Sequence, residues 1–393
     1  MTIIGNLSDT DLGFNFFLSN THQLVSRDSK VWNQELPLNR KSRKTGTGLS
    51  VSYGEYFTAA KIFLEENNHK VLRDAISQQS RKNISLDQST ARNIYLEKHG
   101  EFYHPSRVEL VFPEEKIQFV LNIAASETGR NIIDQEYSIL RRLHRESQNP
   151  YTPAVYGKGF VKTDHGILSM FIGQWFEGFH EFHLSESSRE KRKLVVWDMV
   201  RGNQYLSDRQ AKELYHKAAL ILTSYYHPIT FEHIFPWHHA AGDFVVCLRD
   251  TKVDLRLITI RGYSSLDEGN VDPNLQSIME NMLVFFLILS IRMRIDRLDG
   301  VKEIIWAEDF SVLETLNGFF EGLEEMSLER TRGIPLAECF EYYIFSMEDK
   351  DLVKVTEGIV DHYHIKAEER KIIQKNLKEH VAGIKQGLIK RNL

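Results

Sequence analysis

The arrangement that most constrains the fold is a series of three short apolar runs between residues 92 and 124. The runs are Asn93–Glu97, Arg107–Phe112 and Ile117–Ala124. Gly100 and Pro113 lie in the breaks between them, and both residue types are typical of turns. Consecutive short strands joined by turns predict an antiparallel meander.

A helix is expected directly after the meander, over residues 128–145. Ile133, Tyr137 and Leu140 follow the three-and-four spacing of one buried helix face, and Glu136 is expected on a different face. If Glu136 has no functional role, we expect a surface carboxylate near Arg141 or Arg142.

Two further apolar runs, residues 154–161 and 167–172, flank a short polar turn and predict a hairpin. Strands, helix and hairpin together predict a small α+β lobe over residues 92–172. Residues 1–91 are expected as an N-terminal extension that carries a long amphipathic helix over residues 53–76.

Residues 173–393 are predicted to form a mainly helical lobe. Residues 275–297 are apolar on nearly all sides, which is typical of a buried central helix. The predicted fold class is therefore α+β, with a small antiparallel-sheet lobe and a larger helical lobe.

The composition limits the function classes. A chain of 393 residues with 42% apolar and 26% charged residues is typical of a folded protein of two lobes, and its net charge of −5 gives no general attraction to nucleic acid. The only cysteines are Cys247 and Cys339, which excludes a disulfide scaffold.

The N-terminus has no secretory pattern, and the longest apolar run, residues 282–291, is too short to span a bilayer. We expect a cytoplasmic protein without membrane insertion; the oligomeric state stays open.

The stretch from residue 233 to residue 263 contains several side chains that could take part in catalysis or binding. It carries His238, His239 and Asp243, followed by two apolar runs that predict a tight hairpin over residues 244–260. An amphipathic helix precedes it. Loops held between rigid elements commonly carry functional side chains, so these three residues are candidates for a site.

Two segments of the α+β lobe carry a family resemblance. FVLNIA, at residues 119–124, and DQEYSILRRL, at residues 134–143, resemble a strand and a helix of the protein-kinase-like superfamily. The resemblance is closest to its small-molecule branch, the aminoglycoside phosphotransferases and choline kinases, and covers roughly residues 92–350. In that family a strand lysine and a helix glutamate position the nucleotide phosphates. Glu136 matches the glutamate, but Asn122 stands at the lysine.

The resemblance also implies a nucleotide site. Residues 172–176, with Gln174 and Trp175, match the hinge that meets an adenine ring. ATP with Mg or Mn would then be the cofactors, and a small-molecule or protein ligand would bind in the cleft between the lobes.

Residues 238–259 match the catalytic loop of the family, but some of the family's key residues are absent. One alignment places Asp243 at a metal-binding asparagine, His238 at the catalytic aspartate and Thr259 at the metal-binding aspartate. A rival alignment makes Asp243 the catalytic aspartate. In both alignments at least one key carboxylate is absent.

These departures predict a pseudokinase or atypical kinase that binds a nucleotide or an anionic ligand. In this hypothesis His238 or His239 is a general base and Asp243 a metal ligand. The residues expected at the cofactor are Asn122, Glu136, Gln174, Trp175 and Thr259.

Two alternatives stay open. The first is an active small-molecule phosphotransferase, in which Lys98, Arg107 or Arg261 replaces the absent lysine. The second is an acyltransferase, because residues 238–243 match the HHxxxD motif of condensation domains and chloramphenicol acetyltransferase, with His239 as the base.

Overall fold

The structure of the chain is a computed structural model. It describes residues 13–19, 21–37, 51–80, 84–147, 150–186, 192–198, 201–239, 242–250, 252–267, 269, 272–300, 302–327, 329–362 and 366–391. The chain divides into two compact units. The first unit comprises residues 1–148 and 153–177, and the second comprises residues 149–152 and 178–393. Each unit is described by itself.

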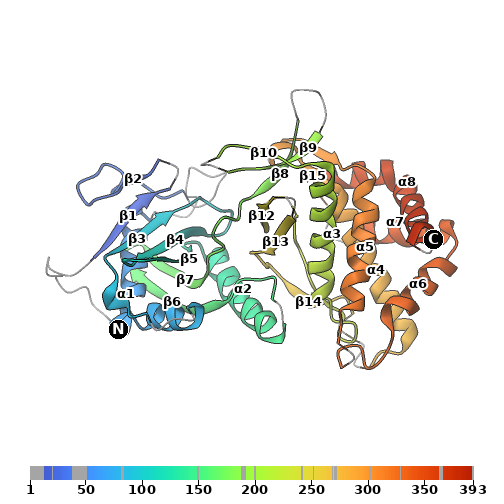
Figure 1. Cartoon of the computed structure of the whole chain (residues 1–393), viewed down its shortest axis with the longest axis horizontal. Coiled ribbons are helices and arrows are strands. Elements are labelled where there is room, and N and C mark those ends of the chain that lie inside the picture. The colour runs from blue at the N-terminus through green and yellow to red at the C-terminus, as the bar shows by residue number, and fades with distance from the viewer. Residues whose placement is uncertain are drawn as a thin grey trace. The chain divides into compact units, whose positions relative to one another are not determined.

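The first unit is built on a seven-stranded sheet with the order β2-β1-β3-β4-β5-β7-β6 (Figure 1). The strands are β1 (Phe14–Leu18), β2 (Gln23–Leu24), β3 (Ala91–Leu96), β4 (His104–Val111), β5 (Lys116–Ala124), β6 (Val155–Thr163) and β7 (Gly166–Gln174). Neighbouring strands are antiparallel except β1 and β3, which are parallel. The predicted meander and the predicted hairpin are confirmed. Among the first 91 residues, β1 and β2 extend the same sheet.

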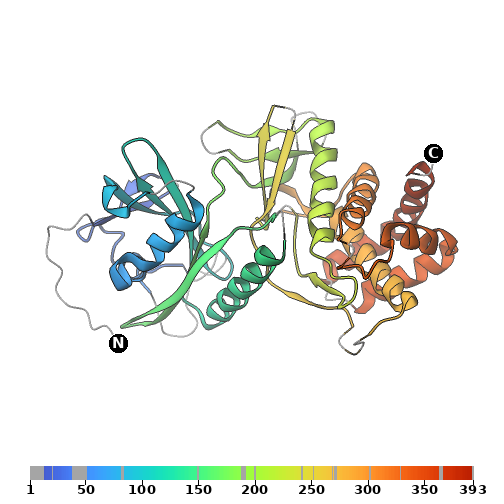
Figure 2. The ribbon, with the colours of Figure 1, turned by 60° about the horizontal axis from the view of Figure 1, so that its bottom comes forward.

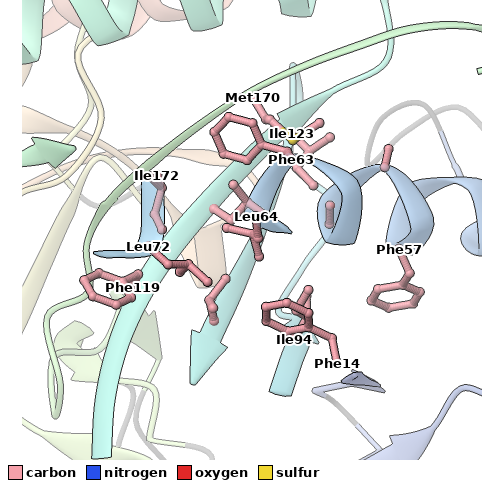
Figure 3. Packing of buried hydrophobic residues seen from close by; sticks show 14 of the residues in the cluster. Phe14, Phe57, Phe63, Leu64, Leu72, Ile94, Phe119, Ile123, Met170 and Ile172 are labelled. Carbon is pink, nitrogen blue, oxygen red and sulfur yellow. The ribbon is translucent and has the colours of Figure 1, made fainter. Parts of the chain in front are cut away.

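Two helices cover opposite faces of this sheet. α1 (Tyr53–Gln79) packs on the face that carries Phe119, Ile123 and Met170, and these side chains form one buried cluster with α1 (Figure 3). α2 (Glu127–Glu146) packs on the other face, where Tyr137 contacts Phe171 of β7. Alternate residues of a strand point to opposite faces, so each helix takes one side-chain set of β5 and β7.

α1 is not the single continuous helix predicted over residues 53–76. It begins with a capping box, in which the Ser52 side chain accepts the backbone N–H of Glu55 and the Glu55 carboxylate accepts that of Ser52. It is interrupted at residues 66–69, where Asn67, Asn68 and His69 have positive φ. Asparagine tolerates the left-handed region better than most residues, and this explains where the break falls.

The second unit is mainly helical. Its helices are α3 (Asp208–Ser224), α4 (Leu275–Arg294), α5 (Phe310–Glu324), α6 (Leu336–Ser346), α7 (Asp349–His362) and α8 (Ala367–Arg391). α3 packs along α5, and α4 is buried along most of its length, with Phe286 in ring contact with Phe319 and Phe340. The predicted buried central helix is confirmed.

α4 is also long and apolar enough to cross a membrane by length and composition alone. However, 61% of its most apolar stretch is buried inside the unit, as in the core helices of many proteins that do not cross membranes. The pattern is therefore weak evidence for a span.

Small strand pairs surround these helices. The predicted hairpin is formed by β12 (Phe244–Arg249) and β13 (Lys252–Leu257), and Phe244 pairs with Leu257. α3 lies beside this hairpin (Figure 2), where Glu213 accepts the N–H of Val253 and Lys217 donates to its carbonyl.

Other strand pairs were not predicted. They are β8 (Phe182–Glu186), β9 (Arg192–Val196) and β10 (Gln204–Tyr205) in one sheet, β11 (Glu232–Ile234) with β14 (Tyr263–Ser265), and β15 (Ile295–Arg297) with β16 (Ile304–Trp306). The prediction that the central helix reaches residue 297 is wrong, because α4 ends at Arg294 and the chain turns into β15. The mixed α+β class, with an antiparallel-dominated sheet and a helical remainder, is confirmed.

Candidate functional site

Asp243 is the centre of the polar loop in the second unit. Its side chain is fully buried, and its Oδ2 accepts hydrogen bonds from Arg261 Nη1 at 2.5 Å and from the backbone N of His238 at 2.8 Å. Its backbone carbonyl accepts the N–H of Ile258 at 2.7 Å. Asp243 therefore links the loop, the start of β12 and the segment after β13. Thr259, the residue after Ile258 in that segment, is half-buried.

The ion pair limits what Asp243 can bind. A guanidinium at 2.5 Å from Oδ2 already neutralises the carboxylate, so a divalent cation bound to Asp243 would lie beside a positive charge. Within the described residues, no group of three His, Cys, Asp or Glu side chains could hold a metal ion. The role of Asp243 as a metal ligand stays a prediction.

His238 and His239 lie with their rings stacked, 5.5 Å apart between centroids and 9° apart in plane. Adjacent residues of an extended strand would place their side chains on opposite sides, and these two rings lie side by side instead. Next to these rings, the backbone N–H of His238 donates to the carboxylate of Asp243.

His239 is a poor general base in this environment. Its side chain is fully buried, and its ring lies 5.5 Å from that of Tyr215. Burial, followed by the charges of Arg292 and His183, lowers the pKa of His239 to about 3. A catalytic base is most effective when its pKa lies near the working pH, and it must reach its substrate.

His238 is also neutral at physiological pH. Loss of solvent around the ring is the main cause that lowers the pKa of His238 well below its ordinary value, and the neighbouring His239 and Arg292 act in the same direction. Its backbone N–H positions Asp243, so at least part of its role is structural.

In the first unit, Asn122 and Glu136 lie in the same layer. Asn122 of β5 pairs with Phe171 of β7, on the face of the sheet that α2 covers, and Phe171 contacts Tyr137, the neighbour of Glu136. Asn122 is 6% exposed and Glu136 is fully buried. Asn122 and Glu136, which match the strand and helix positions of the kinase-like family, therefore both lie between the sheet and α2.

Two expectations for Glu136 were wrong. It does not lie on a different face of the helix from Ile133, Tyr137 and Leu140, and it is not a surface carboxylate. Position 136 lies three residues after 133 and four before 140, so it falls on the same stripe of α2. The packing of α2 on β5 and β7 buries that whole stripe.

The predicted hinge begins at the end of β7. The backbone N–H of Gln174 donates to the carbonyl of Ala154 at 2.8 Å, and its side-chain oxygen accepts the N–H of the same residue at 3.4 Å. These two groups are used within the sheet and are not available to an adenine ring. Trp175 is half-buried, and the guanidinium of Arg107 lies 5.8 Å from its ring.

Two of the cations considered as replacements for the lysine hold carboxylates. Arg107 binds Glu97 at 2.8 Å and Glu109 at 3.2 Å, and Arg261 binds Asp243. Neither is placed as an isolated cation for phosphates.

A buried carboxylate that was not predicted from the sequence, Asp296, lies in β15, two residues after the end of α4. It is fully buried, and its oxygens accept the backbone N–H groups of Leu184 at 3.2 Å and Arg297 at 2.6 Å. Burial raises the pKa of Asp296 to about 7. An acidic residue directly after the most apolar helix was the available signal, but the helix was predicted to continue past it.

No family model matches the chain, and no curated protein matches it. Among solved structures, the chain is similar to a crystal structure described as a kinase domain, with 12% sequence identity and a TM-score of 0.26. The match covers 73% of this chain and 98% of the other. This likeness assigns neither a branch nor an activity, so the aminoglycoside phosphotransferase and choline kinase branch stays a prediction.

Proposed function

We propose that this chain is a kinase-like protein with a degenerate phosphotransferase site, which binds a nucleotide or another anionic ligand and transfers phosphate poorly or not at all. The observation that carries the proposal is the ion pair between Asp243 and Arg261. Phosphoryl transfer needs divalent metal held by carboxylates or amides. In this loop, the carboxylate that aligns with a metal ligand or with the catalytic base is buried against a guanidinium.

The other two positions of the resemblance support the same proposal. Asn122 offers hydrogen bonds but no cation to the phosphates, and Thr259 offers a hydroxyl where a carboxylate would hold metal. Preorganised charges are usually the largest catalytic contribution, and the loss of one costs on the order of a hundredfold in rate. Two such losses are expected to leave little turnover.

Ligand binding is proposed for the segment that begins at Gln174. Trp175 supplies an aromatic face that is not fully buried, and such faces stack on nucleobases. The ligand class is a nucleotide or a similar anion; a small-molecule or protein ligand between the lobes, and a cytoplasmic location, stay predictions.

The acyltransferase alternative is less favoured. That chemistry needs His239 to take a proton from an acceptor, but His239 is fully buried and its pKa is lowered to about 3. The active phosphotransferase alternative depends on a cation that replaces the lysine, and Arg107 and Arg261 both hold carboxylates.

A thermal-shift screen of nucleotides tests the binding part of the proposal. A ligand that binds only the folded state raises the melting temperature. We expect at least one nucleotide to raise it without Mg²⁺ or Mn²⁺, and Trp175→Ala to reduce that shift. Tyr205→Ala, which removes an exposed aromatic side chain from the second unit, is the matched control. No shift with any nucleotide, or shifts that appear only with metal, would contradict the proposal.

A further inference from the structure

β6 is the outermost strand at one edge of the seven-stranded sheet in the first unit (Figure 1). It is nine residues long, whereas β2 at the opposite edge has only two residues. β6 pairs with β7 on one side, and no other described strand pairs with it. Most sheets keep their edge strands short or covered, because an unpaired strand can bind another chain. A long open edge is therefore a candidate interaction site.

The register of the β6–β7 hairpin fixes which backbone groups of β6 point away from β7. A two-residue turn joins Thr163 to Gly166, so these residues form a hydrogen-bonded pair, and the pair types alternate from there along the hairpin. The N–H and C=O groups of Lys158, Phe160 and Lys162 therefore point outward. Among the described residues, these groups have no hydrogen-bond partner. Each of the three residues offers one donor and one acceptor to an added strand.

The side chains of the same three residues alternate along one face of β6 and are exposed. Phe160 is 61% exposed. Ile167 of β7, which is 37% exposed, pairs with Lys162 and lies diagonally beside Phe160 on that face. Lys158 forms an ion pair with Asp134 at 2.7 Å, whereas Lys162 forms none with any described residue. The edge therefore presents an apolar centre between two positive charges.

This charge pattern disfavours a second copy of the chain as the occupant of the edge. If two β6 strands paired antiparallel with their Phe160 rings opposite one another, Lys158 of each copy would lie opposite Lys162 of the other. Like charges directly opposite one another destabilise a strand pair. A register shifted by two residues in either direction would place Phe160 opposite a lysine, and the contact between the two rings would be lost. Lysines at sheet edges commonly prevent such self-association.

We propose that β6 is a docking edge for an extended segment of a partner protein, in which two acidic residues flank an apolar residue at alternate positions. The segment adds a further antiparallel strand to the sheet and hydrogen-bonds to the outward backbone groups of β6. Its apolar side chain packs on Phe160 and Ile167, and its carboxylates lie opposite Lys158 and Lys162. In strand addition, main-chain hydrogen bonds supply affinity and alternate side chains supply specificity. This surface shares no residue with the proposed nucleotide site.

Fluorescence anisotropy of labelled synthetic peptides with the full-length chain tests this edge. The acidic peptide is Thr-Glu-Thr-Val-Thr-Glu-Thr, and the basic peptide has lysine in place of both glutamates. We expect the wild type to bind the acidic peptide more tightly than the basic one. Lys162→Glu is expected to weaken binding of the acidic peptide by about threefold to tenfold and to strengthen binding of the basic peptide. Lys252→Glu, which changes an exposed lysine of the β12–β13 hairpin, is expected to bind both peptides like the wild type.

A modified peptide tests the backbone contacts without any variant of the protein. Methylation of the valine amide nitrogen of the acidic peptide is expected to abolish binding, because that N–H faces β6 in antiparallel pairing. Unchanged binding of the methylated peptide, equal binding of the acidic and basic peptides, or no binding of the acidic peptide would overturn the proposal. A wild-type dimer in sedimentation velocity that Phe160→Thr dissociates would show that a second copy occupies the edge, and this would also overturn it.

Discussion

At the scale of single residues, Asp243 shows how one interaction can both hold a loop and close a site. The carboxylate has no exposed surface, and it is bound by a guanidinium whose own side chain is 27% exposed. Removing one partner of a buried ion pair leaves the other charge in a medium that solvates it poorly.

Arg261→Ala is therefore expected to lower the free energy of unfolding by about 3 kcal/mol. The stability of Arg261→Lys is expected to lie between those of Arg261→Ala and the wild type, because an ammonium keeps the charge but not the planar geometry. Urea denaturation measures both. Arg249→Ala, at an exposed end of β12, is the control and is expected to change stability by less than about 0.5 kcal/mol. Equal effects of Arg249→Ala and Arg261→Ala would contradict the role of the ion pair.

Asp296 leads to a prediction about pH. Its pKa is raised from 3.8 to about 7 by burial, so between these values the folded chain keeps a proton that the unfolded chain has released. Its contribution is therefore fully present below about pH 4 and is lost as the pH rises toward 7, by at most about 1.4 kcal/mol per pH unit. Asp296→Asn cannot ionise.

We expect the urea midpoint of the wild type to fall from pH 5 to pH 8 more steeply than that of Asp296→Asn. Asp164→Asn replaces an exposed carboxylate in the turn between β6 and β7 and is expected to keep the wild-type slope. The same pH slope in the wild type and in Asp296→Asn would show that Asp296 is not the group responsible.

At the scale of elements, the contact between α3 and α5 depends on a glycine. A Cβ at Gly318 of α5 would lie 2.0 Å from the carbonyl oxygen of His216 in α3. The obstacle is backbone, so it cannot rotate away, and the two helices would have to separate. A Cβ at Gly358 of α7 would meet no atom within 4 Å, so this residue serves as the matched helix glycine.

Gly318→Ala is expected to destabilise the chain by about 1 to 3 kcal/mol, as overpacking usually does. Gly358→Ala is expected to stabilise it by roughly 0.5 to 1 kcal/mol, because alanine has a higher helix propensity than glycine and lowers the conformational entropy of the unfolded chain. Melting temperatures of both variants measure the difference. Similar shifts in the two variants would argue against close contact of α3 and α5 at Gly318.

At the scale of the whole molecule, the spacing of apolar residues predicted the elements that are buried on one face or on all sides. The meander, the β12–β13 hairpin and buried α4 have clear apolar patterns, and the structure contains all three. The pairs β8–β9 and β15–β16 were missed because each of these strands has only three to five residues. Segments of this length carry little periodic signal.

The site was harder to predict than the fold. Glu136 falls on the apolar stripe of α2 by helical spacing. It was not predicted to be buried because its side chain is a carboxylate. Likewise, periodicity encodes neither the stacking of His238 on His239 nor the hydrogen bond from His238 to Asp243. Pairings such as Asp243 with Arg261 join residues 18 apart through tertiary structure, and spacing alone does not reveal them.

The most direct test of the degenerate-site proposal is turnover of labelled ATP by the full-length chain with Mg²⁺ and with Mn²⁺, measured beside Asp243→Asn. We predict that the wild type turns over no faster than the variant, because the carboxylate is held by Arg261 and Asn122 supplies no cation at the position of the strand lysine. Robust metal-dependent turnover by the wild type that disappears in Asp243→Asn would contradict the proposal and establish an active phosphotransferase.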